Sequence, residues 1–261
     1  GVYKAPLVLD IRDVWPDSAV AARQLKEGGL LYRIARFIEQ YLYDKASALT
    51  CVSTEMRKYL IGATYCKPIT VAYNGVPLSL IIDGGMRSTE KRIVYAGNLG
   101  RVQDLETLVR AISDLFKEKH DIQWKLVLIG DGVCKEDLKK LISDRHLQES
   151  ITIVKPMGKL EVLRYLSNSG ILYLGVLNHP ILTKTIPSKV FDYLSVGRPI
   201  LAAVNGEGKS ILMRSQANII VEPGNSAEIK FALKELIENY SYYLDKSKEN
   251  VDLVHKYFTR E

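Results

Sequence analysis

The run with the clearest chemical potential is 183–194, TKTIPSKVFDYL. Pro187 and Ser188 stand where a helix begins, so free backbone N–H groups and the positive end of the helix dipole would face an anion there. Lys189 adds a formal positive charge. Asp192, one turn further on, could accept hydrogen bonds from the hydroxyl groups of a sugar or ribose. Taken alone, the run fits a capped helix with solvated charges equally well.

A second candidate is the loop 97–103, GNLGRVQ. Its two glycines would let the backbone approach a ligand, and Arg101 could neutralise phosphate charge. A tight turn with a solvated arginine is the alternative. The similar run 130–132, GDG, is not a dinucleotide fingerprint, because Lys135 stands where a third glycine is needed. NAD binding is therefore disfavoured.

A parallel sheet would bring these loops together. From position 91 onward, β-branched runs alternate with amphipathic helical runs, which predicts a doubly wound α/β sheet. The expected strands are 92–96, 124–129, 150–154, 171–174, 199–203 and 218–221, and the expected helices are 104–118, 135–145, 159–167, 188–196 and 226–239. In such sheets the ligand lies beyond the carboxyl ends of the strands, which is where both candidate loops fall.

The first part of the chain predicts only three strands, 6–11, 48–52 and 69–73, with a long helix over 30–47 and a short one after Ser53. Three strands are too few for an independent sheet domain of this type. The turn-rich stretch 74–90 separates the two parts. We therefore expect a partial domain over 1–75, a complete domain over 76–240 and a tail helix over 241–261.

Composition restricts the function classes. The 36 Lys and Arg residues against 30 Asp and Glu give a net charge of +6, compatible with phosphate-bearing small molecules or anionic lipid. Nucleic acid is disfavoured because basic and acidic residues are interspersed. Three separated cysteines, four dispersed histidines and the lack of an Asp-x-Asp motif predict no disulfide framework, no metal and no cofactor. A reducing cytoplasm is the expected location.

Three runs in order resemble the C-terminal domain of retaining glycosyltransferases of family 4, which have the GT-B fold of two Rossmann-like domains. These runs are 94–100, 128–132 and 187–200. The runs 10–16, DIRDVWP, and 71–76, VAYNGV, also resemble this family, particularly its bacterial amino-sugar transferases for surface polysaccharides such as lipopolysaccharide. The resemblance implies one complete Rossmann-like domain plus a partial second one, truncated at the N-terminus.

The resemblance also implies a substrate and roles for residues. A nucleotide diphosphate sugar, UDP-linked by analogy, would be the donor, and Asp192 would contact its ribose. Arg101 and Lys189 would act catalytically, since fixed positive charge helps the nucleoside diphosphate to depart while the sugar is transferred with retained configuration. The donor-binding residues expected are Gly97, Asn98, Gly100, Gln103, Gly130, Thr185, Pro187, Ser188 and Asp192.

Two positions depart from the family pattern. The usual E-x7-E pair falls on Lys184 and Asp192, and the usual basic pair of the first loop falls on Asn98 and Gln103. The replacement by Lys184 favours one alternative, a nucleotide-sugar binding module without catalysis. A sugar-nucleotide epimerase of the same fold is another alternative.

On the acceptor side, Arg12, Asp13 and Trp15 cluster at the end of the first strand and could meet a glycan or lipid-linked acceptor. A salt-bridged strand end with Trp15 in the core is the alternative. Basic and aromatic residues along 31–43 could touch the inner face of a membrane, although such a stripe is more often a core-facing helix. We expect this truncated chain to bind donor but to transfer sugar poorly alone.

Overall fold

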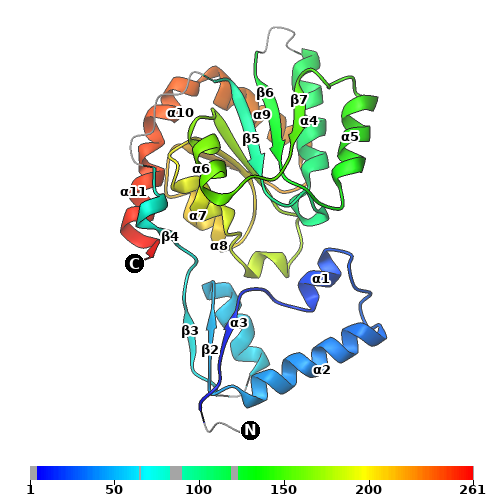
Figure 1. The fold of residues 1–261 in the computed structure, drawn as a ribbon, viewed down its shortest axis with the longest axis vertical. Helices are drawn as coiled ribbons and strands as arrows, with labels where there is room; N and C mark the ends of the chain where they lie inside the picture. Colours follow the sequence, from blue (N-terminus) through cyan, green and yellow to red (C-terminus); the bar gives the residue numbers. More distant parts are fainter. Residues whose placement is uncertain (1–4, 65, 83–89, 119–122, 261) are drawn as a thin grey trace. The chain divides into compact units, whose positions relative to one another are not determined.

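The computed structural model describes residues 5–64, 66–82, 90–118 and 123–260 (Figure 1). Its internal contacts divide the chain into two compact units. The first consists of Gly1–Asn74, His179–Pro187 and Gly206–Gly208. The second consists of Gly75–Asn178, Ser188–Asn205 and Lys209–Glu261. Both units are thus built from segments that are separated in the sequence.

The second unit contains a six-stranded parallel sheet in the order β10-β9-β8-β5-β6-β7. Its strands are β5 Arg92–Ala96, β6 Lys125–Ile129, β7 Ile151–Val154, β8 Ile171–Gly175, β9 Ile200–Ala203 and β10 Asn218–Val221. All five residues of β8 are buried. Continuous apolar strands of this kind are typical of a sheet covered on both faces, and the predicted α/β fold is confirmed.

Helices follow these strands. They are α4 Leu105–Glu118, α5 Lys135–Asp144, α6 Lys159–Ser167, α7 Lys189–Leu194, α8 Glu207–Leu212 and α9 Ser226–Glu238. Figure 1 shows α4 and α5 on one side of the sheet and α6 and α7 on the other. The chain runs outward from β5 to β7 and then returns to place β8 beside β5. This reversal creates a switch point between β5 and β8, beyond whose carboxyl ends a ligand is expected.

The tail differs from the single helix expected over 241–261, and that prediction is wrong. The segment forms α10 Tyr240–Lys246, α11 Lys248–Tyr257 and the short strand β11 Thr259–Arg260, which pairs with β4 Val76–Pro77. The break falls at Ser247, whose hydroxyl donates to the Leu244 carbonyl over 2.6 Å. Serine bonds of this kind compete with the helical ladder, which accounts for the interruption.

One buried amide fixes α11 to the sheet. Asn250 is fully buried, and its Nδ2 donates to the Arg198 carbonyl over 2.9 Å and to Asn218 Oδ1 over 3.0 Å. The Asn218 amide in turn donates to Asn250 Oδ1 over 2.9 Å. This network joins α11 to the starts of β9 and β10.

We expect Asn250→Ala to lower the free energy of unfolding by about 1–3 kcal/mol, because it leaves buried polar groups without partners. Urea unfolding followed by circular dichroism measures the effect. Gln148→Ala, an exposed amide in the same unit, serves as the control and should leave stability nearly unchanged. Equal stability of the two variants would contradict the role given to Asn250.

The first unit is built on a three-stranded parallel sheet in the order β1-β2-β3. Its elements are β1 Val8–Ile11, α1 Asp17–Ala21, α2 Leu30–Lys45, β2 Ala48–Cys51, α3 Thr54–Ala63 and β3 Ile69–Val71. Ser53 caps α3, because its hydroxyl accepts a hydrogen bond from the Met56 N–H over 2.9 Å. The helix α1 was not predicted from the sequence.

Segments from late in the chain complete this unit. The Ser53 hydroxyl donates to the Lys184 carbonyl. The Glu207 carboxylate accepts from the Thr54 N–H and from the Thr54 hydroxyl, each over 2.7 Å, and also from the Tyr73 hydroxyl. The end of α3 nearest Ser53 is therefore held by residues more than a hundred positions away.

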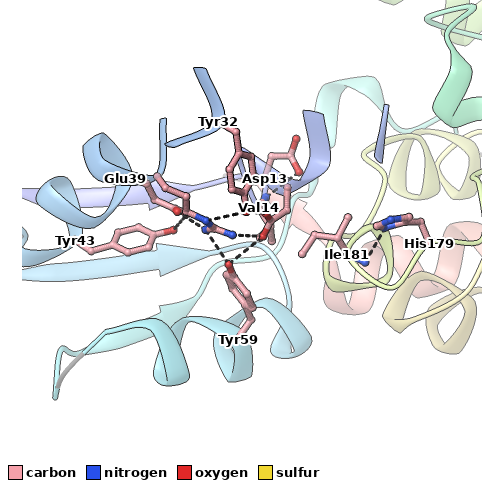
Figure 2. Close-up of polar contacts among 10 residues, drawn as sticks. Asp13, Val14, Tyr32, Glu39, Tyr43, Tyr59, His179 and Ile181 are labelled. Atoms are coloured by element: carbon pink, nitrogen blue, oxygen red, sulfur yellow. Dashed lines mark hydrogen bonds and ion pairs between the residues drawn. The ribbon is translucent and has the colours of Figure 1, made fainter. Parts of the chain in front are cut away.

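The polar side of α2 faces its own unit (Figure 2). Arg36 forms ion pairs with Asp17 and Glu39 and donates to the Tyr59 hydroxyl over 3.2 Å. Tyr43 donates to Glu39 over 2.9 Å. The apolar side of the helix is exposed, as at Leu30, 75%, and Phe37, 73%. Of the basic and aromatic residues along 31–43, Arg36 and Tyr43 thus face inward, as expected for a core-facing helix, whereas Phe37 and Tyr41 are exposed.

Candidate functional site

The loops after β5 and β6 pack against each other through two glycines. The Gly97 N–H donates to the Ile129 carbonyl and the Leu99 N–H to the Asp131 carbonyl, each over 2.8 Å. Gly130 has φ +150°, and a Cβ atom there would lie 1.8 Å from the Gly97 carbonyl oxygen. Only glycine fits such a contact. The absence of a side chain at Gly130 therefore allows the loop after β5 to pack in this position.

Lys189 extends from the start of α7 over the first of these loops. A Cβ atom on Gly97, which has φ +140°, would lie 2.2 Å from Lys189 Cε and 2.6 Å from its Nζ. The ammonium group also lies 5.3 Å from the centroid of the Tyr95 ring. The absence of a side chain at position 97 thus leaves the space that the lysine fills.

The ammonium group of Lys189 has no direct partner for its charge in the described part of the chain. Among the residues that the structure describes, none forms a hydrogen bond or an ion pair with its ammonium group. Burial lowers the pKa of Lys189, Asp192 opposes this shift, and the positive charge of Lys159 adds to it. A partly buried cation without an anionic partner, beside a switch point, is suited to an anionic ligand.

Asp192 is already paired. Its Oδ2 lies 2.5 Å from the Nζ of Lys159, the first residue of α6. No local pattern in the sequence pointed to Lys159, because the pair joins two helices 33 positions apart in the chain (192 − 159). Ser188 is exposed, and its side chain makes no capping bond. The alternative of a capped helix is therefore wrong for the serine hydroxyl.

The remaining predicted residues of the first loop flank Gly100. A Cβ atom at this glycine would lie 2.6 Å from Asn98 Nδ2 and 2.8 Å from Gln103 Oε1. The Gln103 oxygen is buried, and no donor in the described part of the chain reaches it. Arg101 is exposed at the start of the 3-10 turn η2 Arg101–Gln103. The two amides occupy the positions of the basic pair that the family resemblance would have placed there.

Thr185 and Pro187 belong to the first unit, unlike the other predicted donor residues. The Thr185 hydroxyl donates to the Leu182 carbonyl over 3.2 Å. Lys184 places its ammonium group 5.3 Å from the centroid of the Tyr59 ring. Lys184, which stands in place of the usual acidic residue, therefore lies against an aromatic ring of α3.

The predicted acceptor-side residues have separate surroundings. Arg12 pairs with Asp10 over 2.6 Å, as expected for a salt-bridged strand end, and also donates to Asn74. Asp13 accepts hydrogen bonds from the Val14 N–H over 2.8 Å and the Ser18 hydroxyl over 2.9 Å. The Trp15 side chain is 47% exposed, so its predicted alternative, a place in the core, is wrong.

Among the described residues, no group of three or more His, Cys, Asp or Glu side chains is arranged to hold a metal ion. None of the described helices combines the length and apolar character that crossing a membrane requires.

Comparison with known proteins gives a family. Residues 81–252 match the family model "Glycosyl transferases group 1". The chain is 24% identical over 216 residues to the probable glycosyltransferase WbjE of Pseudomonas aeruginosa, covering 76% of this chain and 50% of the relative. It is 28% identical over 142 residues to the amylovoran biosynthesis glycosyltransferase AmsD of Erwinia amylovora, covering 52% and 39%. The chain thus spans about half or less of the length of these relatives.

Solved structures share the fold. HepE of Anabaena in complex with UDP-glucose superposes with a TM-score of 0.78 at 15% identity, over 98% of this chain and 69% of that one. Sucrose-phosphate synthase of Thermosynechococcus elongatus also gives 0.78 at 15% identity, over 97% and 63%. These likenesses establish a GT-B fold.

Proposed function

Since the chain belongs to the group 1 glycosyltransferases, we propose that its second unit binds a UDP-linked sugar as donor. The observation that carries this proposal is the unneutralised ammonium group of Lys189, held over Gly97 beside the β5–β8 switch point. A diphosphate is the anion that this arrangement fits best, because the Lys189 ammonium group offers positive charge at the carboxyl end of β5, where parallel sheets bind phosphates. The HepE structure contains UDP-glucose, which supports uracil as the nucleobase of the proposed donor.

In the proposed complex, Lys189 and the exposed Arg101 bind the diphosphate, and Asp192 accepts a hydrogen bond from the ribose. Asn98, Gly100 and Gln103 line the same loop. The donor glycosidic C–O bond breaks and the UDP takes its electron pair. The sugar carbon bonds to the oxygen of an acceptor hydroxyl with retained configuration, and the proton of that hydroxyl passes to the departing diphosphate. Fixed positive charge stabilises the negative charge that develops on the leaving group.

For the acceptor we propose a glycan or lipid-linked sugar at the inner face of a bacterial membrane. The relative AmsD, named for amylovoran biosynthesis, and an α-D-kanosaminyltransferase of Streptomyces kanamyceticus support a polysaccharide or amino-sugar context. Arg12, Asp13 and Trp15 are the proposed acceptor-side residues. The chain would then be cytoplasmic, with peripheral membrane contact through the exposed apolar side of α2.

A second candidate is a nucleotide-sugar binding module without catalysis. Lys184 favours it, since a base stands where the family pattern has an acid. Both candidates predict donor binding, and only the transferase predicts sugar transfer once the whole protein and an acceptor are supplied.

Calorimetric titration with UDP, GDP, UDP-N-acetylglucosamine and NAD tests the donor site. We expect UDP and its sugar to bind with dissociation constants between about 1 μM and 1 mM, the usual range for enzyme substrates. GDP should bind more weakly, and NAD should not bind, because the Gly130 loop lacks the third glycine of a dinucleotide site. Tighter binding of NAD than of UDP would overturn the proposal.

A further inference from the structure

Two lysines and one carboxylate form a small charge cluster at the proposed donor site. Lys159 Nζ lies 2.5 Å from Asp192 Oδ2, whereas Lys189 influences the same carboxylate only through space. The Asp192 side chain is 23% exposed and that of Lys159 is 53% exposed. Lys159, the more exposed lysine, thus pairs with the Asp192 carboxylate. The charge of Lys189, the more buried lysine, remains available to a ligand.

The positive charge of Lys159 does not stabilise the helix to which it belongs. It is the first residue of α6, where the positive end of the helix dipole disfavours a cation. Its partner lies on another helix, α7, and follows Lys189 by less than one turn. The lysine is therefore placed where its effect falls on Asp192 and, through it, on Lys189.

Removing Lys159 would change which pair forms. Asp192 would then face one cation, Lys189, and attraction between them is stronger in the less exposed surroundings of that lysine. The resulting Asp192–Lys189 pair would neutralise the charge that an anionic ligand needs.

We propose that Lys159 is a positioning residue that holds Asp192 and so keeps Lys189 free to bind the donor diphosphate. This inference rests on the proposed function and adds a residue to it. Lys159 acts through Asp192 and has no assigned contact with the donor.

The test compares Lys159→Met and Lys159→Arg with a matched control, Lys230→Met. Lys230 forms a similar ion pair, 2.6 Å from Glu118, between α9 and α4. We expect Lys159→Met to weaken UDP binding about fivefold, the effect of a modest ion pair. Uridine, which lacks phosphate, should lose less affinity than UDP, because only the ribose contact of Asp192 is affected. Lys159→Arg should retain UDP affinity, and Lys230→Met should not change it.

Equal losses for UDP and uridine would overturn the inference, because Lys159 would then act on ribose recognition. Unchanged UDP affinity in Lys159→Met would overturn it as well.

A second measurement needs no nucleotide. The charged groups that face Lys189 are Asp192 on its own helix and Lys159 on α6, with the Tyr95 ring on β5. A carbon NMR titration of the Lys189 Cε resonance, assigned by its loss in Lys189→Arg, reports its pKa directly. Lys159→Met should raise this pKa, since a repelling charge is removed and Asp192 is released.

An unchanged Lys189 pKa would overturn the inference even if no nucleotide bound. Failure of the wild type to bind any nucleoside diphosphate would instead count against the proposed function, so the two failures are distinguishable.

Discussion

Lys189→Met is expected to weaken UDP binding by about 10-fold to 100-fold, the equivalent of the roughly 1.5–3 kcal/mol of a hydrogen bond to a charged group. Methionine keeps the length and apolar stem that fill the space over Gly97 and removes only the charge. The variant should fold normally, because the ammonium group has no ion-pair partner among the described residues. Calorimetric titration measures the loss, and circular dichroism checks the fold.

Lys139→Met is the matched control, since this exposed lysine on α5 forms an ion pair with Glu136 on its own helix. Its UDP affinity should equal that of the wild type. Equal affinities for the Lys189 and Lys139 variants would place the diphosphate elsewhere and remove the main support for the proposed donor site.

Gly130→Ala is expected to have the largest effect on stability. A Cβ atom 1.8 Å from the Gly97 carbonyl oxygen, at φ +150°, combines a steric clash with a backbone conformation that alanine rarely adopts. We expect a loss of about 3 kcal/mol or more in the free energy of unfolding. Thermal unfolding should show a midpoint lower by roughly 10 °C for a domain of this size.

The control for this variant is Gly158→Ala in the same unit. No atom lies within 4 Å of a Cβ built at Gly158, and its φ of −63° suits any residue. Its stability should change by less than about 0.5 kcal/mol. If Gly130→Ala proves as stable as Gly158→Ala, the loops after β5 and β6 do not pack as described.

The regular elements of the second unit were predictable because each is long and strongly patterned. The strands β5 to β10 are apolar runs bounded by turn residues, and α4 buries seven of its residues on one side. Short elements escaped prediction. The two-residue strands β4 and β11 form because they pair with each other. The local sequence does not predict a pairing partner so far away in the chain.

The residues of the candidate site were likewise predictable only where a local sequence motif marked them. Gly97, Lys189 and Asp192 were found because each lies in a local motif at a strand end or helix start. Lys159 was missed because its significance depends on a partner on another helix. Trp15 was open to two interpretations, since an aromatic residue beside a strand is as consistent with the core as with the surface until the packing is known.

The late segments that complete the first unit have a consequence for the order of folding. Thr54 and Glu207 are separated by 153 positions, and Ser53 and Lys184 by 131. During synthesis, β1, β2 and β3 are made before the second unit, yet the Glu207 carboxylate that accepts hydrogen bonds at the start of α3 is made only after β9. Contacts of such long sequence separation form slowly. Completion of the first unit must therefore wait until residues 206–208 have been made, by which point the strands β5 to β9 of the second unit have also been made.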